Sequence, residues 1–249
     1  MTYAVAPPEP TGSARPADPV DFTTQAYEAL RQAIINADLA PGQIVSQVQL
    51  AAELKVSRTP LREALRRLQS EGLLEGDFNR RLRVASLTVD DLEQVAAMRI
   101  MLEPLGVHAS VPSLTEAAIA RASDAFDAMD AVWTTTGSMH EFTEHHRVFH
   151  STLFSAAGDR MRAQLGELWD HAERYRAIYR TIGNNRMALT TIAHDEHEAI
   201  LTAARDRDAL RCGRLIASHL ARTALATIAA LEPTYDPKLI RRATMLASA

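Results

Sequence analysis

Nine histidines occur in the 249-residue chain, and all of them follow residue 87. His146 and His150 are four residues apart in a stretch with helical periodicity, so both imidazoles can point at one ion. His197 and His219 lie in two later stretches of the same kind. Imidazole is a good ligand for Zn²⁺ and Ni²⁺, and two more helices facing the pair could close the coordination shell. Spacing alone leaves open whether the four bind a metal or are separately hydrogen-bonded or solvated.

A second group with chemical potential is a row of arginines. Arg58, Arg62 and Arg66 recur every four residues, so they form a cationic stripe on one helix face, while Leu61 and Leu65 lie on another face. An arginine stripe on the second of two short helices is typical of a helix-turn-helix in a DNA major groove. A solvated basic face on an ordinary helical hairpin is the alternative, and periodicity does not separate the two.

The stretch from Ser46 to Gly72 must position these arginines, and it indicates two short helices joined by a tight turn. Ser46 is a suitable N-cap for the first, and Pro60 lies in the first turn of the second, where a missing N–H is harmless. After this stretch, strand-like segments at 73–75 and 81–84 flank a loop at 76–80, which predicts a β-wing. Before it, an amphipathic helix is marked by Phe22, Ala26, Leu30 and Ile34.

The charge around the arginines is local. Between Lys55 and Arg83 there are eight basic and four acidic residues, which gives this segment a net charge of +4, whereas the whole chain has −4. A positive patch on an otherwise acidic chain is the expected footprint of a DNA-binding surface.

Everything after the wing indicates helices. Apolar residues make up 47% of the chain and aromatic residues only 5%, which favours helices over sheet. We therefore expect a mainly α protein, with a winged helix-turn-helix at 21–86 and an all-α antiparallel bundle of six or seven helices at 87–249. The expected bundle helices are 88–110, 114–134, 138–157, 159–182, 186–205, 208–231 and 236–247.

Local signals mark some of these helices. Ser113 with Glu116, and Ser138 with Glu141, have the spacing of capping boxes at helix starts. Pro104 predicts a kink in the first bundle helix.

Three further features bound the class of protein. Residues 1–20 hold five of the eleven prolines and predict a disordered tail. The single cysteine, Cys212, excludes an internal disulfide framework and indicates a cytoplasmic protein. No segment has the apolar length of a membrane span or the pattern of a secretory signal, so we expect no membrane partner.

The first part of the chain resembles a known family. The segments LAPGQ and LAAELKVSRTPLREALRRLQSEGLL are similar to the winged helix of the GntR family of bacterial transcription regulators, most specifically in the run from Ser57 to Leu65. The resemblance implies that Arg58 and Arg62 reach base edges and that Ser57 and Thr59 hold phosphates. The predicted DNA-binding residues are Ser57, Arg58, Thr59, Arg62, Arg66, Asn79 and Arg80.

Three residues depart from that pattern. Lys55 stands where glycine is usual in the turn, and Val48 stands where some members have a DNA-contacting arginine. Asn79 occupies the wing-tip glycine position, and asparagine tolerates the left-handed conformation better than most residues.

The second part resembles the FCD ligand-binding domain of the FadR subfamily, so that the likeness covers about residues 22–231. The segments that carry it are Arg99–Glu103, His146–His150, Glu196–Ile200 and Ser218–Leu220. Metal-binding members use an aspartate and three histidines. His150, His197 and His219 match the three histidines, and His146 stands at the aspartate position.

This replacement changes the expected chemistry. A four-histidine shell leaves a divalent ion with one more positive charge than an Asp–His₃ shell, and it suits Zn²⁺ or Ni²⁺ better than Mn²⁺ or Mg²⁺. The alternative is a domain that has lost its metal. Arg99 either pairs with Glu103 four residues on or reaches a ligand carboxylate, and the resemblance favours the carboxylate.

Taken together, these features predict a cytoplasmic transcription regulator, and specifically a repressor. It would bind a palindromic DNA operator as a homodimer and respond to a small carboxylate-type effector near the metal. One alternative is a metal-dependent hydrolase or lyase built on the histidines, although no base–nucleophile pair stands beside them. Another is an architectural DNA-binding protein, which four inward histidines would contradict. We expect no enzyme activity.

Overall fold

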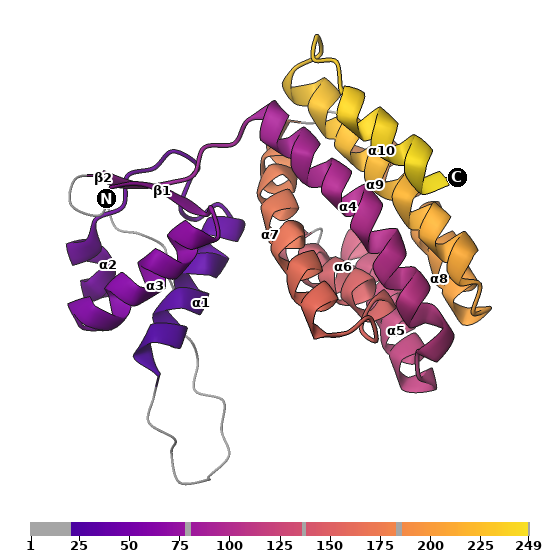
Figure 1. Ribbon diagram of the computed structural model, residues 1–249, viewed down its shortest axis with the longest axis horizontal. Helices are drawn as coiled ribbons and strands as arrows, with labels where there is room; N and C mark the ends of the chain where they lie inside the picture. The colour runs from indigo at the N-terminus through magenta and orange to yellow at the C-terminus, as the bar shows by residue number, and fades with distance from the viewer. Residues whose placement is uncertain (1–20, 78–80, 136–137, 183–185, 249) are drawn as a thin grey trace, which may run out of the picture. The chain divides into compact units, whose positions relative to one another are not determined.

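The computed structural model describes residues 21–77, 81–135, 138–182 and 186–248, and the chain divides into two compact units between Thr88 and Val89 (Figure 1). The elements of the first unit are α1 (Phe22–Ile35), α2 (Gln47–Glu53), α3 (Arg58–Ser70), β1 (Leu74–Asp77) and β2 (Arg81–Val84). Those of the second are α4 (Val89–Ser110), the 3₁₀ turn η1 (Val111–Ser113), α5 (Glu116–Thr134), α6 (Met139–Leu153), α7 (Asp159–Ile182), α8 (Arg186–Arg205), α9 (Ala209–Leu231) and α10 (Lys238–Ser248). The predicted mainly α fold, a winged helix followed by a helical bundle, is confirmed.

The first unit is built around one apolar core. The inward face of α3 is apolar at helical spacing, and it packs against α1 and against the wing strands. The Oγ of Ser46 accepts a hydrogen bond from the backbone N–H of Gln49, so the predicted N-cap of α2 is confirmed. The buried residues of α3 are Leu61, Ala64, Leu65 and Leu68.

Two backbone positions shape the turn before α3 and the wing of this unit. Lys55, in the turn between α2 and α3, has φ +54°, a conformation that costs non-glycine residues energy. This explains why glycine is usual at that place in the family that the sequence resembles. In the wing, β1 pairs antiparallel with β2, and Gly76 has φ +108°. A Cβ on Gly76 would lie 2.2 Å from the carbonyl oxygen of Arg81, so only glycine fits.

Several local predictions were wrong in detail. The side chain of Phe22 is 51% exposed, because α1 begins at that residue and its first turn extends beyond the core. Ser113 does not cap α5: its hydroxyl donates to the carbonyl of Ser110 instead, and Thr115 caps the helix. Strand β1 reaches Asp77, so it includes part of the predicted loop.

Two predicted positions lie outside the described residues. These are the wing-tip residues Asn79 and Arg80. The predicted tail at 1–20 also falls outside the description.

In the bundle, the observed helices follow the predicted ranges closely. Ser138 caps α6 through a hydrogen bond from the backbone N–H of Glu141, as predicted. Pro104 lies inside α4, which continues as one helix to Ser110. Gly213 of α9 faces it, and a Cβ there would lie 3.4 Å from the carbonyl oxygen of Pro104, so the glycine lets the two helices pack closely.

The histidine-bearing helices α6, α8 and α9 pack against other helices of the bundle. Helix α4 packs on α7, α9 and α10, and α5 packs on α6 and α8 (Figure 1). Helix α8 also packs on α9. Among the described residues, no helix is both long enough and apolar enough to cross a bilayer.

Candidate functional site

Helix α3 presents its arginines on the face opposite the core. Arg58, Arg62 and Arg66 are exposed, as are Ser57 and Thr59 at the start of the helix. Ser57 is the N-cap residue, but its side chain makes no capping hydrogen bond, so its hydroxyl is left for another partner. The structure therefore gathers these five predicted DNA-binding residues on one end and one face of α3.

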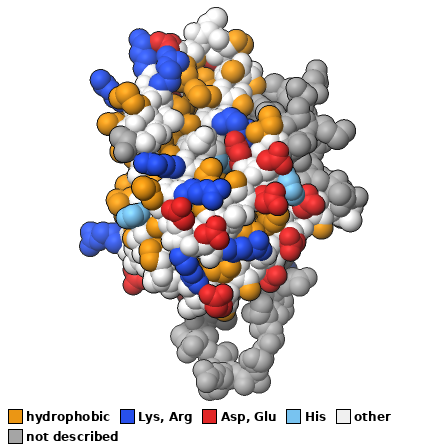
Figure 2. All heavy atoms as spheres, turned by 90° about the vertical axis from the view of Figure 1, so that its right-hand side faces the viewer, with side chains coloured by type: hydrophobic (Ala, Val, Ile, Leu, Met, Phe, Trp, Pro, Cys, Tyr) orange, Lys and Arg blue, Asp and Glu red, His pale blue; other side chains and the backbone are white. Residues whose placement is uncertain are grey.

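Other basic residues of this unit have structural partners. The guanidinium of Arg67 lies 3.6 Å from the ring centroid of Tyr27 and pairs with Glu71. Arg83 of β2 pairs with Glu75 of β1 at 2.9 Å. Part of the local positive charge thus lies in arginines with carboxylate partners, such as Arg67 and Arg83, and part lies in the exposed stripe on α3. By contrast, acidic, basic and hydrophobic side chains are interspersed on the face of the molecule in Figure 2.

The bundle brings together all four histidines singled out from the sequence. His146 and His150 come from α6, His197 from α8 and His219 from α9. All four are buried, and one ring nitrogen of each lies within 4.8 Å of those of the other three. Nitrogens around a tetrahedral zinc ion are about 3.3 Å apart. The cluster is thus close to the size that a small divalent ion requires.

The ring nitrogens of the cluster lie too close together for hydrogen bonds alone to satisfy all of them, as the nitrogens of a metal site do. Nε2 of His197 lies 3.1 Å from Nε2 of His146 and 3.2 Å from Nε2 of His150. A neutral imidazole nitrogen carries either a proton or a lone pair, so three converging nitrogens cannot all be satisfied by linear hydrogen bonds. A cation that accepts several lone pairs satisfies them together, and His150, His197 and His219 have the donor type for it.

A carboxylate behind the cluster fixes the orientation of the His219 ring. Nδ1 of His219 lies 2.7 Å from Oε2 of Glu196, which also pairs with Arg222. Desolvation raises the pKa of Glu196, but the hydrogen bonds from His219 and Arg222 together outweigh this effect and bring the pKa down to about 2. The carboxylate is therefore ionised, so Nδ1–H of His219 donates to it and Nε2 keeps its lone pair.

His146 differs from the other three. Its Nδ1 lies 2.7 Å from Nη1 of Arg176 in α7. Arginine only donates hydrogen bonds, so Nδ1 of His146 accepts, and the proton of the neutral ring sits on Nε2. His146 therefore reaches the cluster with a proton where the others can present a lone pair. It could hold a metal only after losing either this proton or its bond to Arg176.

The burial of the cluster sets its charge. Desolvation is the largest cause that lowers the pKa of His146, His150 and His197 well below 6.5, with nearby histidines and arginines adding to it. Burial also lowers the pKa of His219, although its hydrogen bond to Glu196 opposes the shift. The histidines are neutral at pH 7, and neutral imidazole is the form that binds metals.

Arg99 pairs with Glu103, whereas the resemblance favoured a role in binding a ligand carboxylate. Its Nε lies 2.5 Å from Oε1 of Glu103, four residues on in α4, and both side chains are buried. Its guanidinium also lies 4.8 Å from the ring centroid of Trp169. Nη2 of Arg99 is buried and has no hydrogen-bond partner among the described residues. Arg99 is thus held by Glu103 while one donor stays available.

A small cavity of about 40 Å³ adjoins the cluster. It is lined by both charged and apolar groups, including Arg99, Arg176, His146 and His219. This volume holds a few water molecules, far less than the several hundred cubic ångströms of a typical metabolite site. An organic ligand would therefore have to displace side chains.

Sequence reasoning missed two groups beside the histidines. Arg176 contacts His146, and Trp169 lies with its ring centroid 5.1 Å from those of both His146 and His150. Both come from α7, where they are seven residues, or about two turns, apart on an inward face. Their spacing of seven residues was a usable signal that they share a helix face, but spacing does not tell which helix that face meets.

Comparisons with known proteins agree with this architecture. Residues 22–84 match the family described as bacterial regulatory proteins, gntR family, and residues 94–222 match the FCD domain. The chain is 29% identical over 225 residues to the uncharacterized HTH-type transcriptional regulator BphR of Paraburkholderia xenovorans, covering 88% of each chain. It is 26% identical over 206 residues to the HTH-type transcriptional repressor GlaR of Escherichia coli, covering 78% of this chain and 90% of that one.

A solved structure shows the same fold. The E. coli protein McbR/YncC superimposes with a TM-score of 0.75 at 21% identity, covering 84% of this chain and 97% of that one. The winged helix and the helical bundle of the structure thus coincide with the two family matches. The chain belongs to the GntR family of bacterial regulatory proteins and is a transcription regulator with an FCD domain.

Proposed function

We propose that this regulator represses transcription by binding a palindromic operator as a homodimer, and that its bundle senses a small anionic effector beside a bound divalent metal. The metal would be held by His150, His197 and His219. The observation that carries the proposal is the convergence of buried, neutral ring nitrogens from α6, α8 and α9.

Zinc or nickel fits this donor set better than magnesium or manganese, because imidazole is a borderline-soft ligand and the cluster found among the described residues contains histidines alone. Bound metal would supply a positive centre that attracts an anionic oxygen. Arg99 and Arg176, which line the adjoining cavity, are candidate anchors for the rest of the effector.

The proposed DNA contacts are those of α3 and the wing. Arg58 and Arg62 would read base edges, and Ser57, Thr59 and Arg66 would contact the backbone or flanking bases. Asn79 and Arg80 would contact DNA from the wing tip. One winged helix reads only a few base pairs, so a useful operator needs two copies related by two-fold symmetry.

An exposed apolar row on α4 supports the homodimer. Met98, Met101 and Leu105 are 45%, 43% and 53% exposed, and their spacing places them on one helix face. A second copy of the bundle would bury such a row.

The test begins with chelator-treated full-length protein. Adding Zn²⁺ or Ni²⁺ should raise the melting temperature, because an ion bound only by the folded bundle stabilises it by mass action. His150→Ala or His197→Ala should remove this shift and keep operator binding, since α3 lies in a separate unit. The matched control is His108→Ala, which removes an exposed histidine from α4 and should keep the shift.

If wild-type protein takes up no metal under these conditions, the metal part of the proposal is wrong. The regulator would then recognise its effector through arginines and neutral histidines alone. If the protein fails to bind any DNA more tightly than random sequence, the operator-binding proposal is wrong as well.

A further inference from the structure

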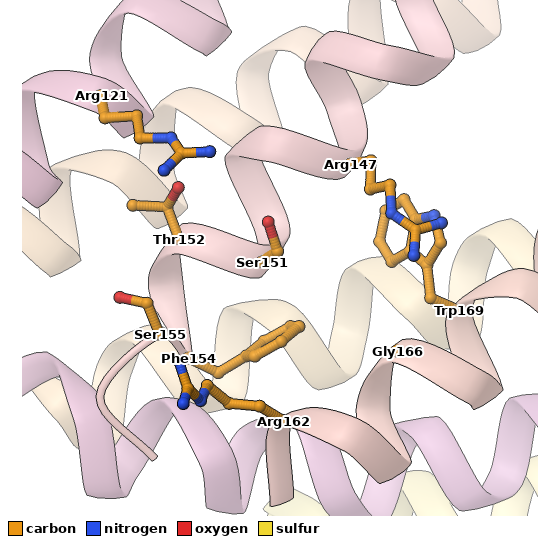
Figure 3. Close-up of a pocket in the computed structure, with 9 residues that line it drawn as sticks. All are labelled: Arg121, Arg147, Ser151, Thr152, Phe154, Ser155, Arg162, Gly166 and Trp169. Carbon is orange, nitrogen blue, oxygen red and sulfur yellow. The ribbon is translucent and has the colours of Figure 1, made fainter. Parts of the chain in front are cut away.

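A second and larger pocket lies on another side of α6, between α5, α6 and the first turns of α7 (Figure 3). Its volume is about 320 Å³, within the range of small-molecule sites. Three arginines line it from three different helices: Arg121 from α5, Arg147 from α6 and Arg162 from α7. Figure 3 shows them around the hydroxyls of Ser151, Thr152 and Ser155, and no acidic residue belongs to the lining.

The three arginines are not equally engaged. Arg147 pairs with Asp170, which is buried, so its guanidinium is held in place. Arg162 pairs with Asp159, whose side chain is 94% exposed, and such solvated pairs are weak. Arg121 has no hydrogen-bond or carboxylate partner among the residues that the structure describes. At least two guanidinium groups can therefore turn toward a ligand.

Helix ends do not explain this gathering of arginines. Helix α6 ends at Leu153 beside the pocket, and its negative end would attract cations. Helix α7 begins at Asp159 beside the same pocket, and its positive end has the opposite effect. Because the two contributions offset each other, the arginines themselves set the potential.

Gly166 is a second, independent indication of a ligand. It lies inside α7, where glycine costs about 1 kcal/mol relative to alanine. Gly106 and Gly213 of the same bundle have packing reasons, since a Cβ on either would meet a neighbour within 3.4 Å. A Cβ on Gly166 would meet nothing within 4 Å. The missing side chain serves no close packing, and it leaves one wall of the pocket open.

Trp169 separates this pocket from the histidine cluster. Its indole is one of the lining groups, together with Phe154, and its ring also contacts His146 and His150. A ligand that moves the Trp169 ring would therefore also shift the ring contacts of His146 and His150, although the ligand itself touches neither histidine. The indole also supplies an apolar surface for an organic group.

We propose that this pocket binds a small organic phosphate, separately from the metal-binding cluster. A carboxylate has two oxygens in one plane and is matched by one arginine fork, whereas the three terminal oxygens of a phosphate monoester point in different directions and can accept from several arginines. Arginines approaching from three helices, with the hydroxyl of Ser155 beside them, match the phosphate. The hydroxyls of Ser151 and Thr152 already donate to the carbonyl of Val148. The organic part packs on Phe154 and Trp169. Binding here gives the regulator a second input that acts on the cluster through Trp169.

The test uses phenyl phosphate and inorganic phosphate with chelator-treated full-length protein at constant ionic strength. Binding is followed by calorimetry and by the fluorescence of Trp169 in a Trp133→Phe background, which leaves Trp169 as the only tryptophan. Phenyl phosphate should bind more tightly than inorganic phosphate and change the emission of Trp169. Arg121→Ala should weaken binding about tenfold, the effect of losing one charge-assisted hydrogen bond.

Matched variants separate this site from general effects of charge and from the metal. Arg214→Ala, which removes an exposed arginine of α9 outside the pocket, should bind as wild type does. Gly166→Leu should fold, because space is open at its Cβ, and should block the pocket, whereas Gly166→Ala should bind nearly as wild type does. His150→Ala should keep phosphate binding even though it removes a proposed metal ligand.

Unchanged affinity for phenyl phosphate in both Arg121→Ala and Gly166→Leu would overturn the proposal. Loss of binding in His150→Ala would overturn it as well, because the anion would then bind at the cluster. Tighter binding of phthalate than of phenyl phosphate would show that the pocket prefers carboxylates and would refute the assignment to phosphate. Each of these results is independent of whether the histidines bind metal.

Discussion

Nη1 of Arg176 donates a hydrogen bond to Nδ1 of His146 over 2.7 Å, although the two residues lie on different helices, α7 and α6. A guanidinium therefore occupies the ring nitrogen that metal-binding histidines usually direct at a carboxylate or a carbonyl. The contact places a fixed positive charge beside the cluster. It also sets His146 apart from the three histidines proposed as ligands.

The first prediction follows from this contact. Arg176→Leu should tighten Zn²⁺ binding about tenfold, because it removes a nearby positive charge and frees Nδ1 of His146. His146→Asp should also keep metal binding, since the carboxylate can pair with Arg176 and still bind an ion. It should weaken binding of an anionic effector, because the charge of the site falls by one. Competition with a fluorescent zinc chelator measures both affinities.

Weaker zinc binding in Arg176→Leu than in wild type would contradict this account. Arg160→Leu is the control, because it removes an exposed arginine from the same helix without touching the cluster.

The second prediction concerns the pH dependence of metal-free protein. In the unfolded chain the histidines take up protons as the pH falls below 6.5, whereas the buried ones of the folded chain stay neutral. The unfolded state then binds more protons than the folded state. The free energy of unfolding therefore decreases as the pH is lowered below 6.5, and it is constant above pH 6.5. Each histidine contributes a slope of about 1.4 kcal/mol per pH unit.

Urea unfolding at pH 7.5, 6.5 and 5.5 measures this loss. Glu196 does not change the slope in that range. Its pKa is 4.5 in the unfolded chain and about 2 in the folded one, so the stability that it contributes is fully present above pH 4.5 and is lost only at lower pH. The His108→Gln variant should show the wild-type slope, whereas His150→Gln should show a smaller one. A free energy of unfolding that is flat down to pH 5.5 would mean that the cluster is not held neutral.

The third prediction concerns base readout. Arg62→Ala should cost about 1–3 kcal/mol of binding free energy on the specific operator, the range for a lost bidentate contact with a base. It should cost much less on random DNA. Arg67→Ala is the control on the same helix: it should lower stability through lost contacts with Tyr27 and Glu71, without relaxing sequence preference. Fluorescence anisotropy on both DNAs gives the comparison, and equal losses in Arg62→Ala would reduce Arg62 to a phosphate contact.

The fourth prediction concerns assembly. Wild-type protein should be a dimer by light scattering at micromolar concentration, and the double variant Met101→Glu, Leu105→Glu should be monomeric, because it places charge in the proposed apolar interface. Leu210→Glu changes a side chain on α9 that is 56% exposed, and it should stay dimeric. A wild-type monomer that still binds one half-site tightly would disprove the dimer model.

Much of the fold could be predicted because its signals are local. Apolar spacing and a capping residue such as Ser46 or Ser138 depend on neighbours within one or two turns, so they fix where helices begin and which face is buried. The errors also have local causes. Ser113 had the spacing of a cap, but the chain turned through η1 first, so Thr115 took that role.

The order of elements, the exposed arginines of α3 and the histidines at helical positions that could face one another can all be inferred from the sequence. The contact of Arg176 with His146, the pairing of Arg99 with Glu103, and the place of Trp169 between the cluster and the larger pocket emerge when the helices pack. The reason is physical. Helical periodicity fixes the direction of a side chain relative to its own axis, but the neighbour that it meets depends on how helices cross, and those crossings are set by packing between residues far apart in the chain.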